Sequence, residues 1–352
     1  MKTLKSKTLG DKKMPTARRK TVAASQESWI KTGHLLPDKE IPFLVEPAMD
    51  GLNLVEWAKN NRPFIEEVLL QHRALLFRNF NVKNVDEFEA FVMATSDGDL
   101  LEYRDRTTPR HSEGGQSDRI YISTIYPSEQ TIKPHNEGTY WMKWARKLYF
   151  CCLTAPEQGG ETPIHDVRKV YERIDPEIRN RFIEKQWMLV RNFNDGFGLT
   201  WQEVFQTEDK SEVEEYCRNN SINFEWKDGD RLRTESIRPA VRKHPETGEP
   251  VWFNHAAFYH HSSLEPSMRE ALLAEFSEKN LPYNTCYGDG MLISPEDAEH
   301  IRQAYEQEKV MFPWQKGDVL LLDNMTIAHA REPYIGDRRI VVAMTEPVYA
   351  SN

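Results

Sequence analysis

The chain has 352 residues, of which 39% are hydrophobic and 11% aromatic, and it carries a formal net charge of -9. Such a chain can bury a large core in one or two globular domains, and its acidic balance argues against a general affinity for nucleic acid or anionic membranes. It contains no run of roughly 20 apolar residues that could span a bilayer, and four cysteines do not indicate a disulfide framework, so we expect a protein of the reducing cytoplasm.

The N-terminus is strongly basic. Its first 20 residues carry eight Lys or Arg and a single acid, Asp11, but they lack the apolar core of a secretory signal. We expect residues 1–25 to form a disordered basic tail, with a targeting or docking segment as the alternative. No repeat, linker or low-complexity tract divides the rest, so residues 26–352 are predicted to form one domain.

Helices alternate with strands in the first third of the chain. Apolar residues recur at helical spacing over residues 51–71, and Asn61-Arg62-Pro63 interrupts them, which predicts two short helices. Residues 74–77 are predicted to form a buried strand. Residues 85–94 are predicted to form a helix with an acidic outer face.

Strands dominate after a polar loop at 102–118. A helical, acidic insertion is predicted at about 201–220, and further helices at 265–276 and 295–308. Runs of β-branched and aromatic residues predict strands at 119–124, 147–154, 186–193, 224–226, 232–234, 251–253, 318–323 and 339–345. These short strands favour a mainly β fold with flanking helices, such as a jelly roll. A Rossmann fold is excluded because no Gly-rich turn joins a strand to a helix.

A short motif, Pro134-His135-Asn136-Glu137, lies between two β-rich runs. Side chains at i and i+2 of an extended strand point the same way, so His135 and Glu137 can converge on one ion. The pair alone is weak evidence, because the chain has 11 histidines and 55 acidic residues. His329, which follows the predicted strand at 318–323, is a third candidate. Two imidazoles and one carboxylate form the ligand set of non-haem Fe(II) oxygenases, and zinc hydrolases use a similar set.

Four motifs occur in a fixed order along the chain: Pro134 to Glu137, Gly159-Gly160-Glu161-Thr162-Pro163, Gly317-Asp318 through Asp323-Asn324, and His329 to Arg339. This ordered set resembles the taurine dioxygenase-like family of Fe(II)- and 2-oxoglutarate-dependent oxygenases. The resemblance is to its H-x-E branch, which includes clavaminate synthase-like enzymes and SyrP-like amino-acid hydroxylases. It covers roughly residues 74–344, and it implies a double-stranded β-helix, the cupin-like jelly roll.

The resemblance also implies a role for each motif. The implied Fe(II) ligands are His135, Glu137 and His329, and the implied 2-oxoglutarate contacts are Thr162, as a hydrogen-bond donor, and Arg339, at the distal carboxylate. Arginine suits this task because its planar fork can bond a carboxylate bidentately. Arg338 competes with Arg339, but neighbours on a strand face opposite sides, so only one can face the pocket. The family pattern favours Arg339, and Arg338 is expected to face solvent.

Three further residues are candidates for binding the substrate. Arg106 and Arg110 lie in the loop before the metal motif, where a cation could bind a substrate carboxylate; the alternative is that they are solvated loop arginines. His255 occupies a position where the family more often has Gln. This departure is interpreted either as a change in substrate choice or as a tolerated surface substitution.

The resemblance implies an enzyme that uses Fe(II), 2-oxoglutarate and O₂ to oxidise an unactivated C–H bond of an amino acid or a derivative. The substrate is expected to be free or attached to a carrier protein, in the metabolism of a peptide natural product. Hydroxylation is expected, because Glu137 fills a position where related halogenases have a small residue. Desaturation or cyclisation uses the same ligands. A non-catalytic binding module would have lost a ligand or Arg339, and a zinc hydrolase would leave Thr162 and Arg339 unexplained.

Overall fold

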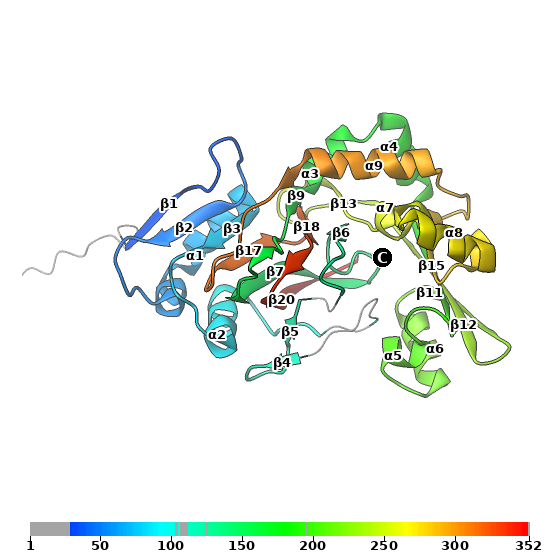
Figure 1. The fold of residues 1–352 in the computed structure, drawn as a ribbon, viewed down its shortest axis with the longest axis horizontal. Coiled ribbons are helices and arrows are strands. Elements are labelled where there is room, and N and C mark those ends of the chain that lie inside the picture. The colour runs from blue at the N-terminus through cyan, green and yellow to red at the C-terminus, as the bar shows by residue number, and fades with distance from the viewer. Residues whose placement is uncertain (1–28, 103–104, 106–111, 124–125, 195, 351–352) are drawn as a thin grey trace, which may run out of the picture.

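A computed structural model describes residues 29–102, 105, 112–123, 126–194 and 196–350 of the chain. The basic tail and the two loop arginines, Arg106 and Arg110, lie outside these ranges. The described part is built on two facing sheets, with helices against their outer faces (Figure 1). None of the helices in these ranges is both long enough and apolar enough to cross a membrane.

The larger sheet has eight strands in the order β1-β2-β3-β17-β7-β20-β5-β4. Its strands are β1 (Ile30–His34), β2 (Phe43–Pro47), β3 (Ala74–Phe77), β4 (Ser112–Gly114), β5 (Ile120–Ile122), β7 (Lys143–Thr154), β17 (Val319–Asp323) and β20 (Arg339–Tyr349). All pairs are antiparallel except β2 with β3. The central strands have apolar side chains on both faces, because both faces of the sheet are covered.

One face of this sheet packs against α1 (Leu54–His72) and α2 (Val85–Thr95), through a core that includes Phe77, Phe91 and Tyr149. The two short helices predicted at 51–71 are one helix, α1, which is kinked at the predicted interruption. The backbone leaves helical geometry at Asn61, two residues before Pro63, whose ring and missing N–H disfavour a continuous helix.

The other face of the larger sheet packs against a second sheet, through a core that includes Phe150, Leu320 and Ile327. The second sheet has the order β16-β9-β18-β6 and comprises β6 (Ile132–His135), β9 (Ile164–Asp166), β16 (Lys309–Val310) and β18 (Ile327–Arg331). Its outer side is covered by α3 (Val167–Arg173), α4 (Pro176–Lys185) and α9 (Pro295–Gln307) (Figure 1).

A third sheet, in the order β11-β12-β10-β15, lies beside these two (Figure 1). It comprises β10 (Trp187–Phe193), β11 (Ile222–Lys227), β12 (Arg231–Arg238) and β15 (Tyr283–Tyr287), and two small pairs are β13 (Val241–Lys243) with β14 (Pro250–Trp252) and β8 (Gln158–Gly159) with β19 (Tyr334–Ile335). The remaining helices are α5 (Trp201–Phe205), α6 (Lys210–Asn219), α7 (Ala256–Tyr259), α8 (Pro266–Glu275) and the 3₁₀ turns η2 (His261–Ser263) and η3 (Glu278–Asn280). Helices α5 and α6 form most of the segment expected to be a helical insertion.

Candidate active site

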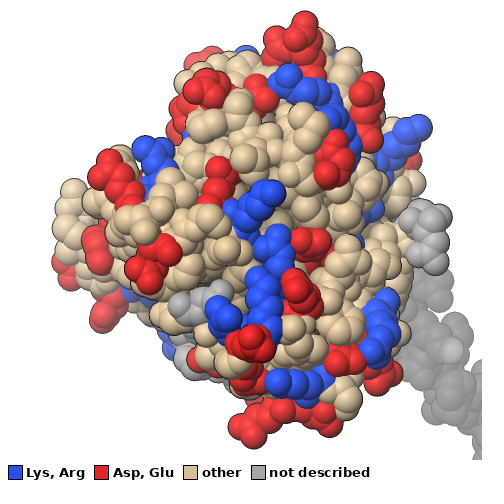
Figure 2. All heavy atoms as spheres, turned by 90° about the vertical axis from the view of Figure 1, so that its right-hand side faces the viewer, with Lys and Arg blue, Asp and Glu red and all other residues tan. Residues whose placement is uncertain are grey.

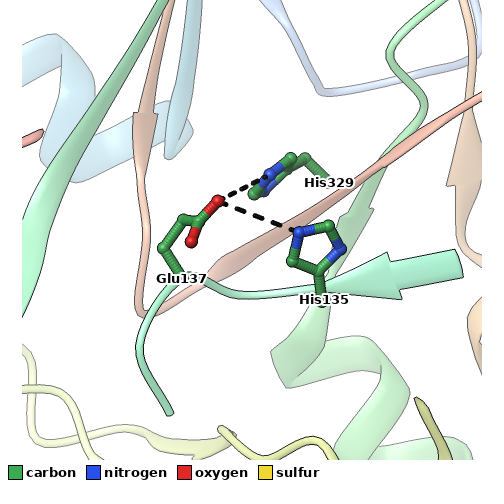
Figure 3. A group of neighbouring side chains, drawn as sticks. All are labelled: His135, Glu137 and His329. Carbon is green, nitrogen blue, oxygen red and sulfur yellow. Dashed lines mark ion pairs between the residues drawn. The ribbon is translucent and has the colours of Figure 1, made fainter. Parts of the chain in front are cut away.

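Three metal-ligating side chains converge at one end of the second sheet (Figure 3). His135 ends β6 and pairs directly with His329 of the neighbouring strand β18. Glu137 Oε1 lies 3.9 Å from His135 Nε2 and 3.6 Å from His329 Nε2. All three side chains are 12% exposed or less, so an ion held among them would be largely removed from bulk water.

The local backbone differs from the expected extended strand. β6 ends at His135, and Glu137 lies in the turn that follows, where Trp141 N–H bonds to the carbonyl of Gly138 at 2.9 Å. The two side chains therefore do not converge because they alternate along one strand. They converge because the chain turns back toward β18 immediately after His135.

The donor set fits a divalent iron. His135 Nδ1 lies 2.9 Å from the carbonyl of Lys133, which fixes the proton on Nδ1 and leaves the lone pair on Nε2, the atom that faces Glu137. Two imidazole nitrogens and one carboxylate oxygen on the same side of an ion leave its other positions available to ligands.

A second cluster of His and Glu side chains, formed by His260, His261 and Glu278, lies elsewhere in the molecule. Hydrogen bonds already occupy both ring nitrogens of His260, with Nε2 at 3.1 Å from the carbonyl of Ile293 and Nδ1 at 2.7 Å from Ser262 Oγ. His260 therefore has no ring nitrogen left to bind a metal ion. His165, another histidine of the second sheet, bonds through Nδ1 to the carbonyl of Tyr305 on α9, away from the triad.

A cavity beside the triad is lined by Arg338 and Thr162. Arg338 Nη2 lies 3.3 Å from Thr162 Oγ1, and Trp314 Nε1 donates to the same oxygen at 3.1 Å. Because the Thr162 oxygen accepts both bonds, its own proton can be donated to a further acceptor. Burial lowers the pKa of Arg338 to about 10, with a smaller contribution from Arg331, so the guanidinium is still charged at neutral pH.

Arg339 points away from this cavity, so the expectation that it faces the pocket and that Arg338 faces solvent is wrong. Arg339 is 49% exposed and bonds to Glu113, with Nε at 2.8 Å from Oε2. Arg338 precedes β20 and shares its side with Ile340 and Val342, which belong to the core between the two sheets. Of these two neighbours, Arg338 is therefore the one that lines the cavity.

His255 lies next to the triad, and its side chain is buried, which excludes the interpretation as a surface substitution. Its ring centre is 5.8 Å from that of His135, and Nδ1 is hydrogen-bonded to Thr139. Burial lowers the pKa of His255 well below its usual value, and the neighbouring His135 adds to this effect, so the ring is neutral. The rings of Phe258 and Tyr259 lie beside it, at 5.2 and 5.3 Å.

Sequence reasoning missed the residues that hold Glu137 and Thr162 in place. Asn324 bonds to the backbone of Glu137, and Trp314 bonds to Thr162. The sequence placed Asn324 in an ordered motif but did not indicate its partner. No local pattern in the sequence indicates that Trp314 bonds to Thr162.

Comparison with known proteins identifies the family. A family model described as taurine catabolism dioxygenase TauD, TfdA family, matches residues 37–345. The chain belongs to the TauD/TfdA dioxygenase family. It is 40% identical to the dapdiamide synthesis protein DdaC of Enterobacter agglomerans over 287 residues, which cover 82% of this chain and 86% of DdaC.

A second relative agrees with this assignment, and a solved structure shares the fold. A clavaminate synthase-like protein of Arabidopsis thaliana is 30% identical over 319 residues, which cover 88% of this chain and 91% of the plant protein. The crystal structure of a taurine dioxygenase from Burkholderia xenovorans shares the fold, with a TM-score of 0.53 and 17% identity over 92% of this chain and 95% of that one.

Membership confirms the expected jelly roll and the enzyme class. The protein is a dioxygenase that uses Fe(II), 2-oxoglutarate and O₂ on a small-molecule substrate. The alternatives of a zinc hydrolase and a non-catalytic binding module are therefore set aside.

Proposed function

We propose that this dioxygenase hydroxylates an unactivated C–H bond of an amino-acid-derived substrate in the synthesis of a natural product. The observation that carries the chemistry is the His135–Glu137–His329 triad beside the Arg338–Thr162 pair in one cavity. The relation to DdaC, a protein named for dapdiamide synthesis, supports the type of pathway.

In this proposal, His135, Glu137 and His329 hold Fe(II), which when bound activates O₂ while 2-oxoglutarate is converted to succinate and CO₂. Arg338 binds the distal carboxylate of 2-oxoglutarate, and Thr162 donates a hydrogen bond to it. The Arg338 side chain is already oriented by bonds to the carbonyl of Gly160 at 2.9 Å and to Ser123 Oγ at 3.2 Å. A fixed cation in a buried cavity interacts strongly with a carboxylate, because little water screens the pair.

Glu137 favours hydroxylation over halogenation, because its carboxylate occupies the position that a halide would need. Desaturation and cyclisation use the same ligands and are the alternative outcomes. The neutral ring of His255 lies among Phe258, Tyr259 and Tyr140, with ring centres 5.2 to 5.8 Å away, and we propose that it contacts the substrate. The binding of a substrate carboxylate by Arg106 and Arg110 stays a prediction from the sequence.

We propose a free amino acid, with a carrier-bound one as the alternative. Figure 2 shows a line of Lys and Arg side chains on one face of the molecule, with Asp and Glu on both sides of it. Among the described residues, this face offers no broad basic surface for an acidic carrier domain, and the whole chain carries a net charge of -9.

Replacement of a single ligand tests the metal assignment. Glu137→Ala should abolish substrate-dependent succinate release and weaken Fe(II) binding strongly, because one of three protein ligands is lost, while circular dichroism shows a folded protein. His261→Ala, from the second His and Glu cluster, is the matched control and should keep both properties. If Glu137→Ala retains normal turnover without added carboxylate, the triad does not hold the iron.

A further inference from the structure

The carboxylate ligand is held in a different way from the two histidines. His135 and His329 face each other across the paired strands β6 and β18, so the hydrogen bonds of the sheet fix their separation. Glu137 lies beyond the end of β6, in the turn that follows. The ladder of the sheet therefore does not position the carboxylate.

Asn324 makes the contacts that hold the backbone of Glu137 in place. It lies in the tight turn between β17 and β18, and its side chain is fully buried. Its Oδ1 accepts a hydrogen bond from Glu137 N–H at 2.8 Å, and its Nδ2 donates to the carbonyl of Glu137 at 3.0 Å and to that of Ala145 at 2.8 Å. The N–H and the carbonyl of the ligand residue are thus both bonded to one amide side chain.

Asn136 bonds in the reverse direction. It is the middle residue of the H-x-E motif, it is fully buried, and its Nδ2 donates to the backbone carbonyl of Asn324 at 2.7 Å. The turn is itself fixed, because the Asp323 carboxylate accepts from Met325 N–H at 3.0 Å and pairs with His244 at 2.8 Å. The carboxylate ligand is therefore tied to a rigid turn five residues before His329.

We propose that Asn324, assisted by Asn136, is the positioning residue that sets the Glu137 carboxylate at the correct distance from His329. The role requires an amide, because the same side chain must accept one hydrogen bond and donate two. Aspartate could accept from Glu137 N–H, but it would place a negative charge against two carbonyl oxygens. The inference rests on the proposed role of Glu137 as a metal ligand.

A double-mutant cycle tests the proposal, with Co²⁺ as a redox-stable probe of the site in the full-length protein. Asn324→Ala should weaken Co²⁺ binding by about 10- to 100-fold, the usual effect of removing a partner that orients a ligand, and should alter the visible absorption of bound Co²⁺. In a protein that already carries Glu137→Ala, the same change should have little further effect, because the residue acts through that carboxylate. Asn136→Ala, which removes one bond, should show a smaller change in the same direction and serves if Asn324→Ala does not fold.

Asn192→Ala is the matched control for a purely structural role. Asn192 is also a buried asparagine that donates to a backbone carbonyl, that of Leu281 at 2.8 Å, but it lies in the third sheet. It should lower stability and leave Co²⁺ affinity and absorption unchanged.

Three results would overturn the proposal. One is wild-type Co²⁺ affinity in folded Asn324→Ala and Asn136→Ala. Another is an equal loss of affinity from Asn324→Ala with and without Glu137, which would show a general effect on folding. If Glu137→Ala itself binds Co²⁺ as the wild type does, the ligand assignment is wrong and the positioning role fails with it.

Discussion

Arg338 and Arg339 are neighbours with opposite environments, and this difference supports the proposal that Arg338 binds the co-substrate. Arg338 lies inside the cavity with Thr162, whereas Arg339 is half exposed and paired with Glu113. An ion pair at the surface contributes about 1 kcal/mol at most, but a buried charged partner contributes far more to binding.

We therefore expect Arg338→Ala to raise the 2-oxoglutarate concentration needed for half-maximal succinate release by roughly 30-fold or more, equivalent to about 2–5 kcal/mol. Arg339→Ala should change it little. Arg338→Lys should recover only part of the loss, because an ammonium keeps the charge and loses the planar fork. Co-substrate titrations of the three variants check this, and a larger effect at Arg339 would return the role to that residue.

The sequence did not show which of Arg338 and Arg339 points into the cavity, because β20 is apolar on both faces. Ile340 and Val342 face the core between the sheets, and Val341 faces the core under α1 and α2. In a strand covered on both sides, hydrophobic alternation carries no information about which face is inside. The cluster of His135, Glu137 and His329 was predictable, because the residue types and their order along the chain indicate it.

At the scale of elements, the long central strands and the amphipathic helices were predictable from periodicity, but the support of the site was not. The strand before Glu137 ends two residues earlier than an extended H-x-E motif requires, because the chain turns there to meet Asn324. The partner is 187 positions away, so local periodicity cannot show it. Strand β15 (Tyr283–Tyr287) was not predicted either, because its pairing partner β10 is also distant in the sequence.

The turn between α7 and η2 makes the stability of the protein depend on pH. His260 is buried there, and burial, together with the neighbouring His261, lowers its pKa to about 4. The folded state thus keeps the ring neutral, while the unfolded chain takes up a proton below its ordinary pKa of about 6.5. Folding is therefore opposed increasingly as the pH falls from about 6.5 toward about 4.

His260→Gln should reduce this dependence. The amide can still donate to the carbonyl of Ile293, the partner of His260 Nε2, but it does not titrate. The variant should lose on the order of 2 kcal/mol less stability than the wild type between about pH 7 and pH 5, as measured by urea unfolding at each pH. Parallel pH profiles for the two proteins would show that His260 does not contribute.

At the scale of the whole molecule, the fold brings together two proposed metal ligands that are 192 positions apart in the chain, Glu137 and His329. β6 and β18 are neighbours in the second sheet, while β17, which leads into β18, belongs to the larger sheet. The turn at residues 323–326 therefore crosses from one sheet to the other directly beside the proposed iron site. The order of the motifs indicated that these distant segments meet. No motif indicated the third sheet, which lies beside them.

Whether the substrate is free or attached to a carrier protein also depends on the surface of the whole molecule, because the two kinds of substrate need different surfaces. A free α-carboxylate needs a cation near the entrance, for which Arg106 and Arg110 are the candidates from the sequence, while a carrier domain needs a complementary docking face. We expect succinate release with free amino acids, lowered by Arg110→Ala through a higher KM, and little stimulation by carrier-loaded ones. Lys59→Ala, at an exposed surface pair on α1, is the matched control for loss of a positive charge and should leave KM unchanged. Activity confined to carrier-loaded substrates and unaffected by Arg110→Ala would exclude the free amino acid and leave the iron chemistry intact.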